Sequence, residues 1–263
     1  MKKLLVIFVS FSSTVAFAQS KDTFMPDNDL WKQDSFEASN GGITQTVFNK
    51  IVAAGKKAYT ENARQNNEAL VINALWTDAT VNANCCRGCE PGKVIVNMYG
   101  GLARRSEITP EGFALVLGHE LSHAYGGAPY IEEAERMSAE GQADYQGART
   151  AYKKLAALVP DLKKDISVDD SIKEFCKDKT GEDLKDCIHS LSGGMSLGKL
   201  LSTLSGDGPV SYQTPDPTVV DETLTSYPST TQCRVDTYLA GTLNKDRPAC
   251  WFKPTSFVPR WYY

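Results

Sequence analysis

Residues 109–127 read TPEGFALVLGHELSHAYGG, and they predict the helix on which the fold and its chemistry depend. Thr109 is suited to cap this helix, and Pro110 fits its first turn, where no N–H donor is needed. Apolar residues then recur at spacings of three and four until two glycines end the pattern. An HExxH motif lies inside the helix, so His119 and His123 share one face.

This motif indicates a catalytic metal site. Two imidazoles four residues apart on a helix can bind one ion, while the carboxylate of Glu120 projects toward a water on that ion. Catalytic zinc usually takes three protein ligands and keeps a position for water, so a third ligand must come from elsewhere. The alternative is a chance occurrence of the motif on a core helix, which the signals for the start and end of the helix make less favoured.

The third ligand is expected on a second helix over residues 136–155, where the spacing of apolar residues is again helical. Glu140 and Asp144 lie four residues apart, so their carboxylates share a face. We expect Glu140 to bind the metal and Asp144 to accept a hydrogen bond from a ligating histidine. A solvated pair of acids with no metal is the alternative. Other candidates for the third ligand are Glu132, Glu133 and Glu135.

Residues 1–18 predict a secretory leader, with two lysines before a short apolar run and Ala16-Phe17-Ala18 as the cleavage site. The apolar run is short and is followed by serines, which argues against a membrane span. No cysteine follows the cleavage site, which argues against a lipid anchor. We therefore expect a single exported domain over residues 19–263, in the periplasm or outside the cell, with no transmembrane segment.

The charge of the chain argues against a nucleic-acid partner. The formal net charge is -4, and neighbouring basic residues form only short pairs. A protein or peptide substrate is the expected partner, and the sequence leaves the oligomeric state open.

Seven cysteines in an exported chain favour disulfides over metal thiolates, and three bridges would leave one thiol over. A zinc knuckle near residues 85–89 is a weaker alternative, because no second C-x-x-C motif completes four ligands. The preferred groupings are Cys176 with Cys187, Cys233 with Cys250, and a cluster of Cys85, Cys86 and Cys89.

Three alternating segments rich in β-branched residues precede the HExxH helix and predict strands at residues 70–76, 80–83 and 93–99. The chain is therefore expected to be an α+β protein. A strand beside a zinc helix can offer its edge to an extended peptide, whose carbonyl then meets the metal. A sheet that only packs beneath the helix is the alternative.

Four motifs together resemble the gluzincin metallopeptidases that include the CAAX prenyl proteases, the membrane heat-shock proteases and soluble periplasmic quality-control proteases. They are the V-N-A strand at 80–83, the edge strand and G-L-x-R turn at 93–104, the HExxH helix at 113–123, and the R-x-x-x-E-x-x-A-D helix at 136–144. The resemblance covers roughly residues 44–154. It implies a zincin-like, mainly helical fold with a small sheet whose edge strand flanks the HExxH helix.

The resemblance also implies roles for the site residues. One zinc ion per chain would be bound by His119, His123 and Glu140. Glu120 would be the general base, and Asp144 would hold a ligand in place from outside the ligand set.

The resemblance is weaker near the end of the chain. Where the family often carries T-H-P, this chain has S-Y-P with Tyr227 in place of the histidine, and Arg234 follows. Either side chain could donate a hydrogen bond to an oxyanion, and Arg234 could instead pair with a ligand carboxylate. A purely structural role for both is the alternative.

The spacing between the HExxH motif and Glu140 is shorter than in many members of this family. Residues 156–225, with several prolines and the Cys176/Cys187 pair, are expected to form an accessory region that covers or flanks the cleft. His189 in this region is expected to pack rather than to bind a metal.

These expectations combine into an exported zinc-dependent endopeptidase that cuts extended or unfolded protein segments. A zinc-activated water would attack the peptide carbonyl, with Glu120 taking its proton and passing it to the leaving amine. One alternative is a metal-stabilised binding or chaperone-like module with little or no peptidase activity. A zinc hydrolase that acts on other bonds is a third, less favoured hypothesis.

Overall fold

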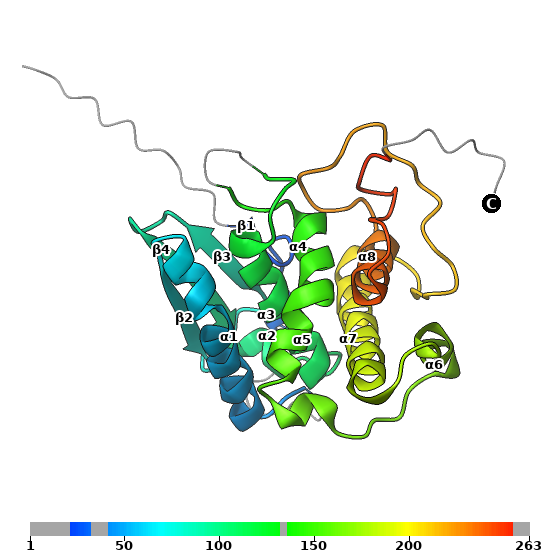
Figure 1. The fold of residues 1–263 in the computed structure, drawn as a ribbon, viewed down its shortest axis with the longest axis horizontal. Coiled ribbons are helices and arrows are strands. Elements are labelled where there is room, and N and C mark those ends of the chain that lie inside the picture. Colours follow the sequence, from blue (N-terminus) through cyan, green and yellow to red (C-terminus); the bar gives the residue numbers. More distant parts are fainter. Residues whose placement is uncertain (1–21, 33–41, 132–135, 255–263) are drawn as a thin grey trace, which may run out of the picture.

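The computed structural model describes residues 22–32, 42–131 and 136–254. Within these ranges the chain forms an α+β fold, in which a small mixed sheet lies at one side and helices make up the rest (Figure 1). The expected fold class is thereby confirmed at this level. The leader at residues 1–18 and the three alternative ligands within 132–135 lie outside the described residues. In the described ranges, no helix combines the length and apolar character needed to cross a bilayer.

The sheet has the strand order β1-β3-β4-β2. Strand β2 runs parallel to β4, whereas the β3–β4 and β1–β3 pairs are antiparallel. Alternate residues of β4 are buried, as expected for a sheet with one face in the core. The strands are β1 (Asp22–Thr23), β2 (Ala69–Leu75), β3 (Ala83–Arg87) and β4 (Lys93–Tyr99).

The strand expected at residues 80–83 was wrong in position, because β3 begins only at Ala83. The carbonyl of Thr80 accepts a hydrogen bond from the amide of Leu102, so the backbone there is bonded to helix α2 (Gly100–Arg104) instead of to a strand.

The strand expected at the edge was also wrong in place. Residues 93–99 form β4, which lies inside the sheet between β3 and β2. The strand that packs mainly against the HExxH helix is β3, and its outer side carries the two-residue strand β1.

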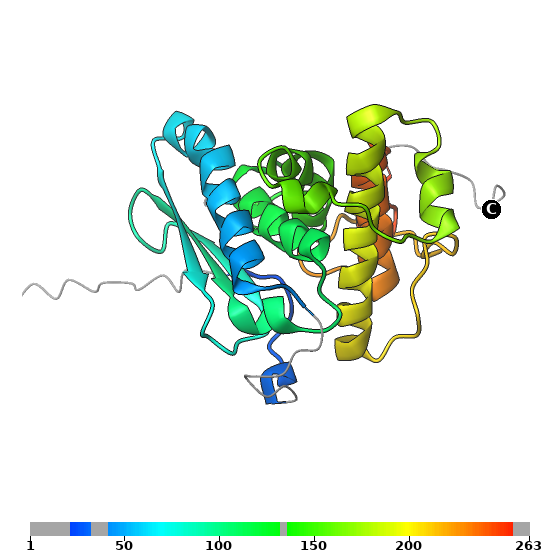
Figure 2. The ribbon, with the colours of Figure 1, turned by 90° about the horizontal axis from the view of Figure 1, so that it is seen from below.

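The HExxH helix, α3 (Pro110–Tyr125), lies at the centre of the molecule, between the sheet and the C-terminal helices (Figure 2). Its predicted limits are confirmed, because the Thr109 hydroxyl accepts from the amide of Gly112 and the helix ends before Gly126. The other helices are α1 (Gln45–Gln65), α4 (Glu140–Gln146), α5 (Tyr152–Ala156), α6 (Asp170–Cys176), α7 (Gly181–Ser205) and α8 (Thr231–Leu243). Short turns are η1 (Leu30–Lys32), the π-helical η2 (Gly147–Ala151) and η3 (Pro160–Lys163).

The second expected helix was wrong at its start. It begins at Glu140 instead of at residue 136, because the preceding backbone is bonded elsewhere. The amide of Ser138 donates to the carbonyl of His123, and that of Ala139 donates to Pro129. The π-helical turn η2 then separates α4 from α5.

Helix α7 connects the region at 156–225 to the rest of the molecule. It packs against α3 on one side and α8 on the other. Many of its residues are buried, among them Leu197 and Leu200 in the main core.

The cysteine groupings agree with the expectation. The disulfides are Cys176–Cys187, which joins α6 to α7, Cys233–Cys250, and Cys86–Cys89. Cys85 is buried and is not part of a disulfide. Because Cys86 and Cys89 are bonded to each other, they do not form a zinc knuckle.

Candidate metal centre

His119, His123 and Glu140 come together between α3 and α4, with their donor atoms within 4.8 Å of one another. The two Nε2 atoms are 2.9 Å apart, and Glu140 oxygens lie 3.4 Å from Nε2 of His119 and 3.8 Å from Nε2 of His123. Donor atoms at tetrahedral positions about 2.0–2.1 Å from zinc lie about 3.3 Å apart. The three side chains therefore fit a single ion of this size.

The hydrogen bonds on the far side of each ring determine where the ring proton lies. Nδ1 of His123 is 2.8 Å from the carbonyl oxygen of Ser138, which can only accept, so Nδ1 donates. Nδ1 of His119 is 2.8 Å from Oδ1 of Asp144 and donates to that carboxylate. With Nδ1 as the donor in each ring, the two Nε2 atoms face each other and are the atoms available to bind a cation. This donor set fits a divalent metal.

Charge and burial keep these groups in the protonation states that a metal site needs. Burial lowers the pKa of His119 to about 4, an effect that the carboxylate of Asp144 opposes only in part. Burial alone would raise the pKa of Asp144, but the charge of Arg234 and the bond from His119 outweigh it and hold that pKa well below its usual range. At neutral pH the imidazole is therefore neutral and the carboxyl is ionised.

Small residues allow α3 to approach the helix that carries Glu140 and Asp144. A Cβ atom on Gly118 would lie 3.0 Å from the side chain of Ala151, and one on Gly147 would lie 3.1 Å from the backbone of His119. These contacts leave room for little beyond hydrogen. Gly147 and Ala151 are the first and last residues of the π-helical turn η2. Such turns often occur at functional sites, but this one was not predicted from the sequence.

Arg234 and Tyr238 of α8 hold Asp144 from the other side. The guanidinium of Arg234 binds both carboxylate oxygens, with Nε 2.7 Å from Oδ2 and Nη2 2.9 Å from Oδ1. The Tyr238 hydroxyl donates to Oδ1 at 2.9 Å. Arg234 thus pairs with the carboxylate that orients His119, rather than with Glu140. Tyr238 was not predicted from the sequence, although it lies one turn after Arg234 on the same helix.

Tyr227 and Arg234 both reach the N-terminal segment, by which we mean residues 22–25. The Tyr227 hydroxyl donates to the carbonyl of Thr23 and lies 2.8 Å from its hydroxyl. Nη1 of Arg234 donates to the carbonyl of Phe24 at 2.8 Å. The two side chains considered for oxyanion binding therefore donate to backbone carbonyls of this segment.

The cluster is closed to solvent. His119, Glu120 and His123 are 0% exposed, and Glu140 is 2% exposed. The ring of Phe24 contacts His119 edge to face, with centroids 5.2 Å apart, and is itself fully buried. Among the described residues, the side chains of the candidate metal cluster are therefore almost completely shielded from solvent.

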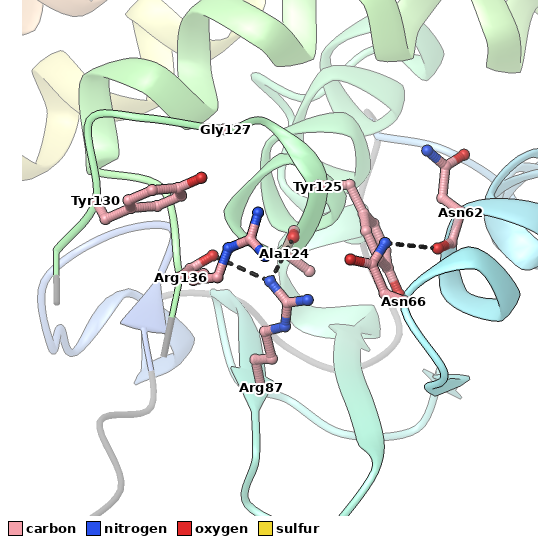
Figure 3. Close-up of a pocket in the computed structure, with 8 residues that line it drawn as sticks. All are labelled: Asn62, Asn66, Arg87, Ala124, Tyr125, Gly127, Tyr130 and Arg136. Atoms are coloured by element: carbon pink, nitrogen blue, oxygen red, sulfur yellow. Dashed lines mark hydrogen bonds between the residues drawn. The ribbon is translucent and has the colours of Figure 1, made fainter. Parts of the chain in front are cut away.

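A pocket at the C-terminal end of α3 does not include the cluster (Figure 3). Arg87 lines this pocket and donates to the carbonyls of Ala124 and Arg136. It also forms an ion pair with Glu68. The remaining lining comes from Asn62, Asn66, Tyr125, Gly127 and Tyr130. Because none of the three ligands lines it, this pocket is separate from the candidate metal centre.

His189 lies at the opposite end of α3 and is buried. Its Nδ1 is 3.1 Å from a carboxylate oxygen of Glu111 in the first turn of that helix. It is not among the residues of the candidate metal cluster.

Comparisons with known proteins identified no relative of this chain. A scan against models of protein families, a search of curated proteins and a search of solved structures each returned no match to the chain.

Proposed function

We propose that this chain is a zinc-dependent endopeptidase of the gluzincin type, exported to the periplasm or the exterior, that cuts extended or unfolded protein segments. The observation that carries the proposal is the pair of Nε2 atoms 2.9 Å apart beside the carboxylate of Glu140. A donor set of two neutral imidazoles and one carboxylate is typical of catalytic zinc. The three disulfides support an oxidising compartment.

In this mechanism a bound zinc ion would supply Lewis acidity and lower the pKa of a coordinated water. Glu120, which follows His119 on α3, would act as the general base toward that water and as the proton donor to the leaving amine. Asp144 keeps the Nδ1 proton of His119 directed away from the metal, and Arg234 keeps Asp144 ionised.

A casein digestion tests this proposal. Purified, processed protein is incubated with casein, with and without a chelator, beside Glu120→Gln and the matched control Glu111→Gln. Both substitutions replace a buried glutamate on α3, but Glu111 contacts His189 instead of the cluster. We expect Glu120→Gln to retain zinc and to lose about 10²–10⁴-fold in rate, as for removal of a general base, whereas Glu111→Gln stays active. Equal cleavage by Glu120→Gln and the original chain would refute the mechanism.

The complete burial of the cluster favours one second candidate function. A metal enclosed in this way stabilises a fold without reaching a substrate, so the chain could be a metal-stabilised binding or chaperone-like module. Zinc retention together with no cleavage by any variant, including one with an opened site, would support this module over the peptidase.

A further inference from the structure

The N-terminal segment lies on β3 as an added strand. Thr23 is opposite Asn84, and the amide of Phe24 donates to the carbonyl of Ala83 at 3.1 Å. The pairing is antiparallel, and β3 is the strand that packs most against α3. Proteases and peptide-binding domains commonly bind an extended chain by adding it to a sheet edge in this way.

The other side of the segment is bonded by the two side chains that could serve a substrate. Tyr227 donates to the carbonyl of Thr23, and Arg234 donates to the carbonyl of Phe24. Thr23 and Phe24 are thus held between β3 and the region at 227–234. An extended substrate crossing the cluster would present the same pattern of backbone carbonyls.

The side chain of Phe24 covers part of the site. Phe24 inserts between His119 and Arg234, with its ring 5.2 Å from the imidazole and 4.5 Å from the guanidinium carbon. Met25 is also fully buried, and the amide group of Asn82 binds its backbone N–H and carbonyl at 3.0 Å and 2.9 Å. Removal of the Phe24 ring would take away a side chain that directly covers a metal ligand.

We propose that the N-terminal segment is an intramolecular inhibitory strand, which occupies the place of an extended substrate and must leave β3 before the site can be used. The proposal rests on the proposed function, because it identifies the substrate site with the groove that the segment fills. It accounts for a cluster that has the ligands of a catalytic centre yet is 0–2% exposed. A two-residue strand has only a few ladder hydrogen bonds to break when it leaves β3.

The test compares Phe24→Ala with Leu30→Ala in the full processed chain loaded with zinc. Leu30 is buried in the same N-terminal stretch, within η1, so its truncation serves as the matched control. The two readouts are the rate at which a chelator removes zinc and the rate of casein cleavage. We expect Phe24→Ala to raise both at least tenfold, whereas Leu30→Ala changes neither.

A second variant guards against misfolding of Phe24→Ala. Thr23→Val keeps the volume of the side chain but loses the hydroxyl that contacts Tyr227 and the carbonyl of Met25. It is expected to raise both rates by a smaller factor. A synthetic peptide of residues 20–28 should slow zinc loss and casein cleavage by the opened variants, because it would refill the groove.

The outcomes separate this inference from the proposed function. Faster zinc loss from Phe24→Ala or Thr23→Val, reversed by the peptide, supports the inhibitory strand even if no variant cleaves casein, in which case the peptidase proposal fails. Rates that match the original chain in both variants, or an equal acceleration in Leu30→Ala, would overturn the inference and leave the segment as an ordinary core strand.

Discussion

The two sides of the candidate metal centre are built in different ways. The inner side consists of Asp144, Arg234 and Tyr238, where charged and polar groups bind one another in the core. The outer side consists of the N-terminal segment with Tyr227, and hydrogen bonds from Tyr227 and from Arg234, which contacts both sides, hold its backbone carbonyls. The inner side is suited to keep the ligands fixed, and the outer side is suited to be replaced. Under the proposed function, the inner side would hold the metal ligands in place, and the outer side is the part that an extended substrate would replace.

The largest expected effect comes from Arg234→Leu, which removes the charge that compensates Asp144. Breaking a buried ion pair leaves an uncompensated charge, so the free energy of unfolding should fall by about 3–5 kcal/mol. Urea denaturation measures it. Arg247→Leu is the control, because Arg247 is partly exposed and its guanidinium contacts neutral groups, the amide oxygen of Gln142 and two aromatic rings. A loss below about 1 kcal/mol for Arg234→Leu would mean that the inner side is not held by this pair.

Next in size is Asp144→Asn, which weakens the acceptor that orients His119. Outer partners of metal-bound histidines typically contribute about 10–100-fold in affinity, so zinc binding should weaken by that factor. Competition with a chromophoric chelator provides the measurement. Asp183→Asn removes an exposed carboxylate that pairs with Lys153, and its zinc affinity should not change. An unchanged zinc affinity for Asp144→Asn would show that the inner side does not contribute to metal binding.

A smaller effect is expected for Thr109→Ala, at the far end of the helix that carries both histidines. The loss of the cap on Gly112 should cost about 1 kcal/mol of unfolding free energy. Zinc affinity and the exchange of the N-terminal segment should stay as they are, since the cap contacts neither side of the site. A change in zinc affinity would show that the metal centre depends on the whole helix.

The smallest effect is expected for Tyr227→Phe, which removes one hydroxyl from the outer side. A hydrogen bond of this kind contributes about 0.5–1.5 kcal/mol. The Phe24 amide donates to the carbonyl of Ala83, and its hydrogen-exchange rate should rise by the factor equivalent to this loss of free energy. The amides of α3 should keep their protection. Equal acceleration along α3 would contradict the separation of the two sides.

The same contrast explains which features could be predicted from the sequence. The limits of α3 follow from Thr109 and Gly126, and the pairing of the two histidines follows from helical spacing, because all of these signals are local. The disulfides Cys176–Cys187 and Cys233–Cys250 also join residues that lie close in the sequence.

Features that depend on contacts between distant parts of the backbone could not be predicted from local sequence signals. The second helix begins late because Ser138 is bonded to the end of α3, and β3 begins late because Thr80 is bonded to α2. The contact of Phe24 with His119 and Arg234 brings together three separate parts of the chain. Local composition holds no signal for it, so the position of the N-terminal segment at the site was not predicted, although Tyr227 was.

The central claim is that one divalent ion is bound by His119, His123 and Glu140, and anomalous diffraction at the zinc edge tests it most directly. Crystals of the processed protein reconstituted with zinc should show one peak within about 2.0–2.2 Å of both Nε2 atoms and of a Glu140 oxygen. The absence of a peak there, or an ion bound by Glu132, Glu133 or Glu135 in place of Glu140, would contradict the account.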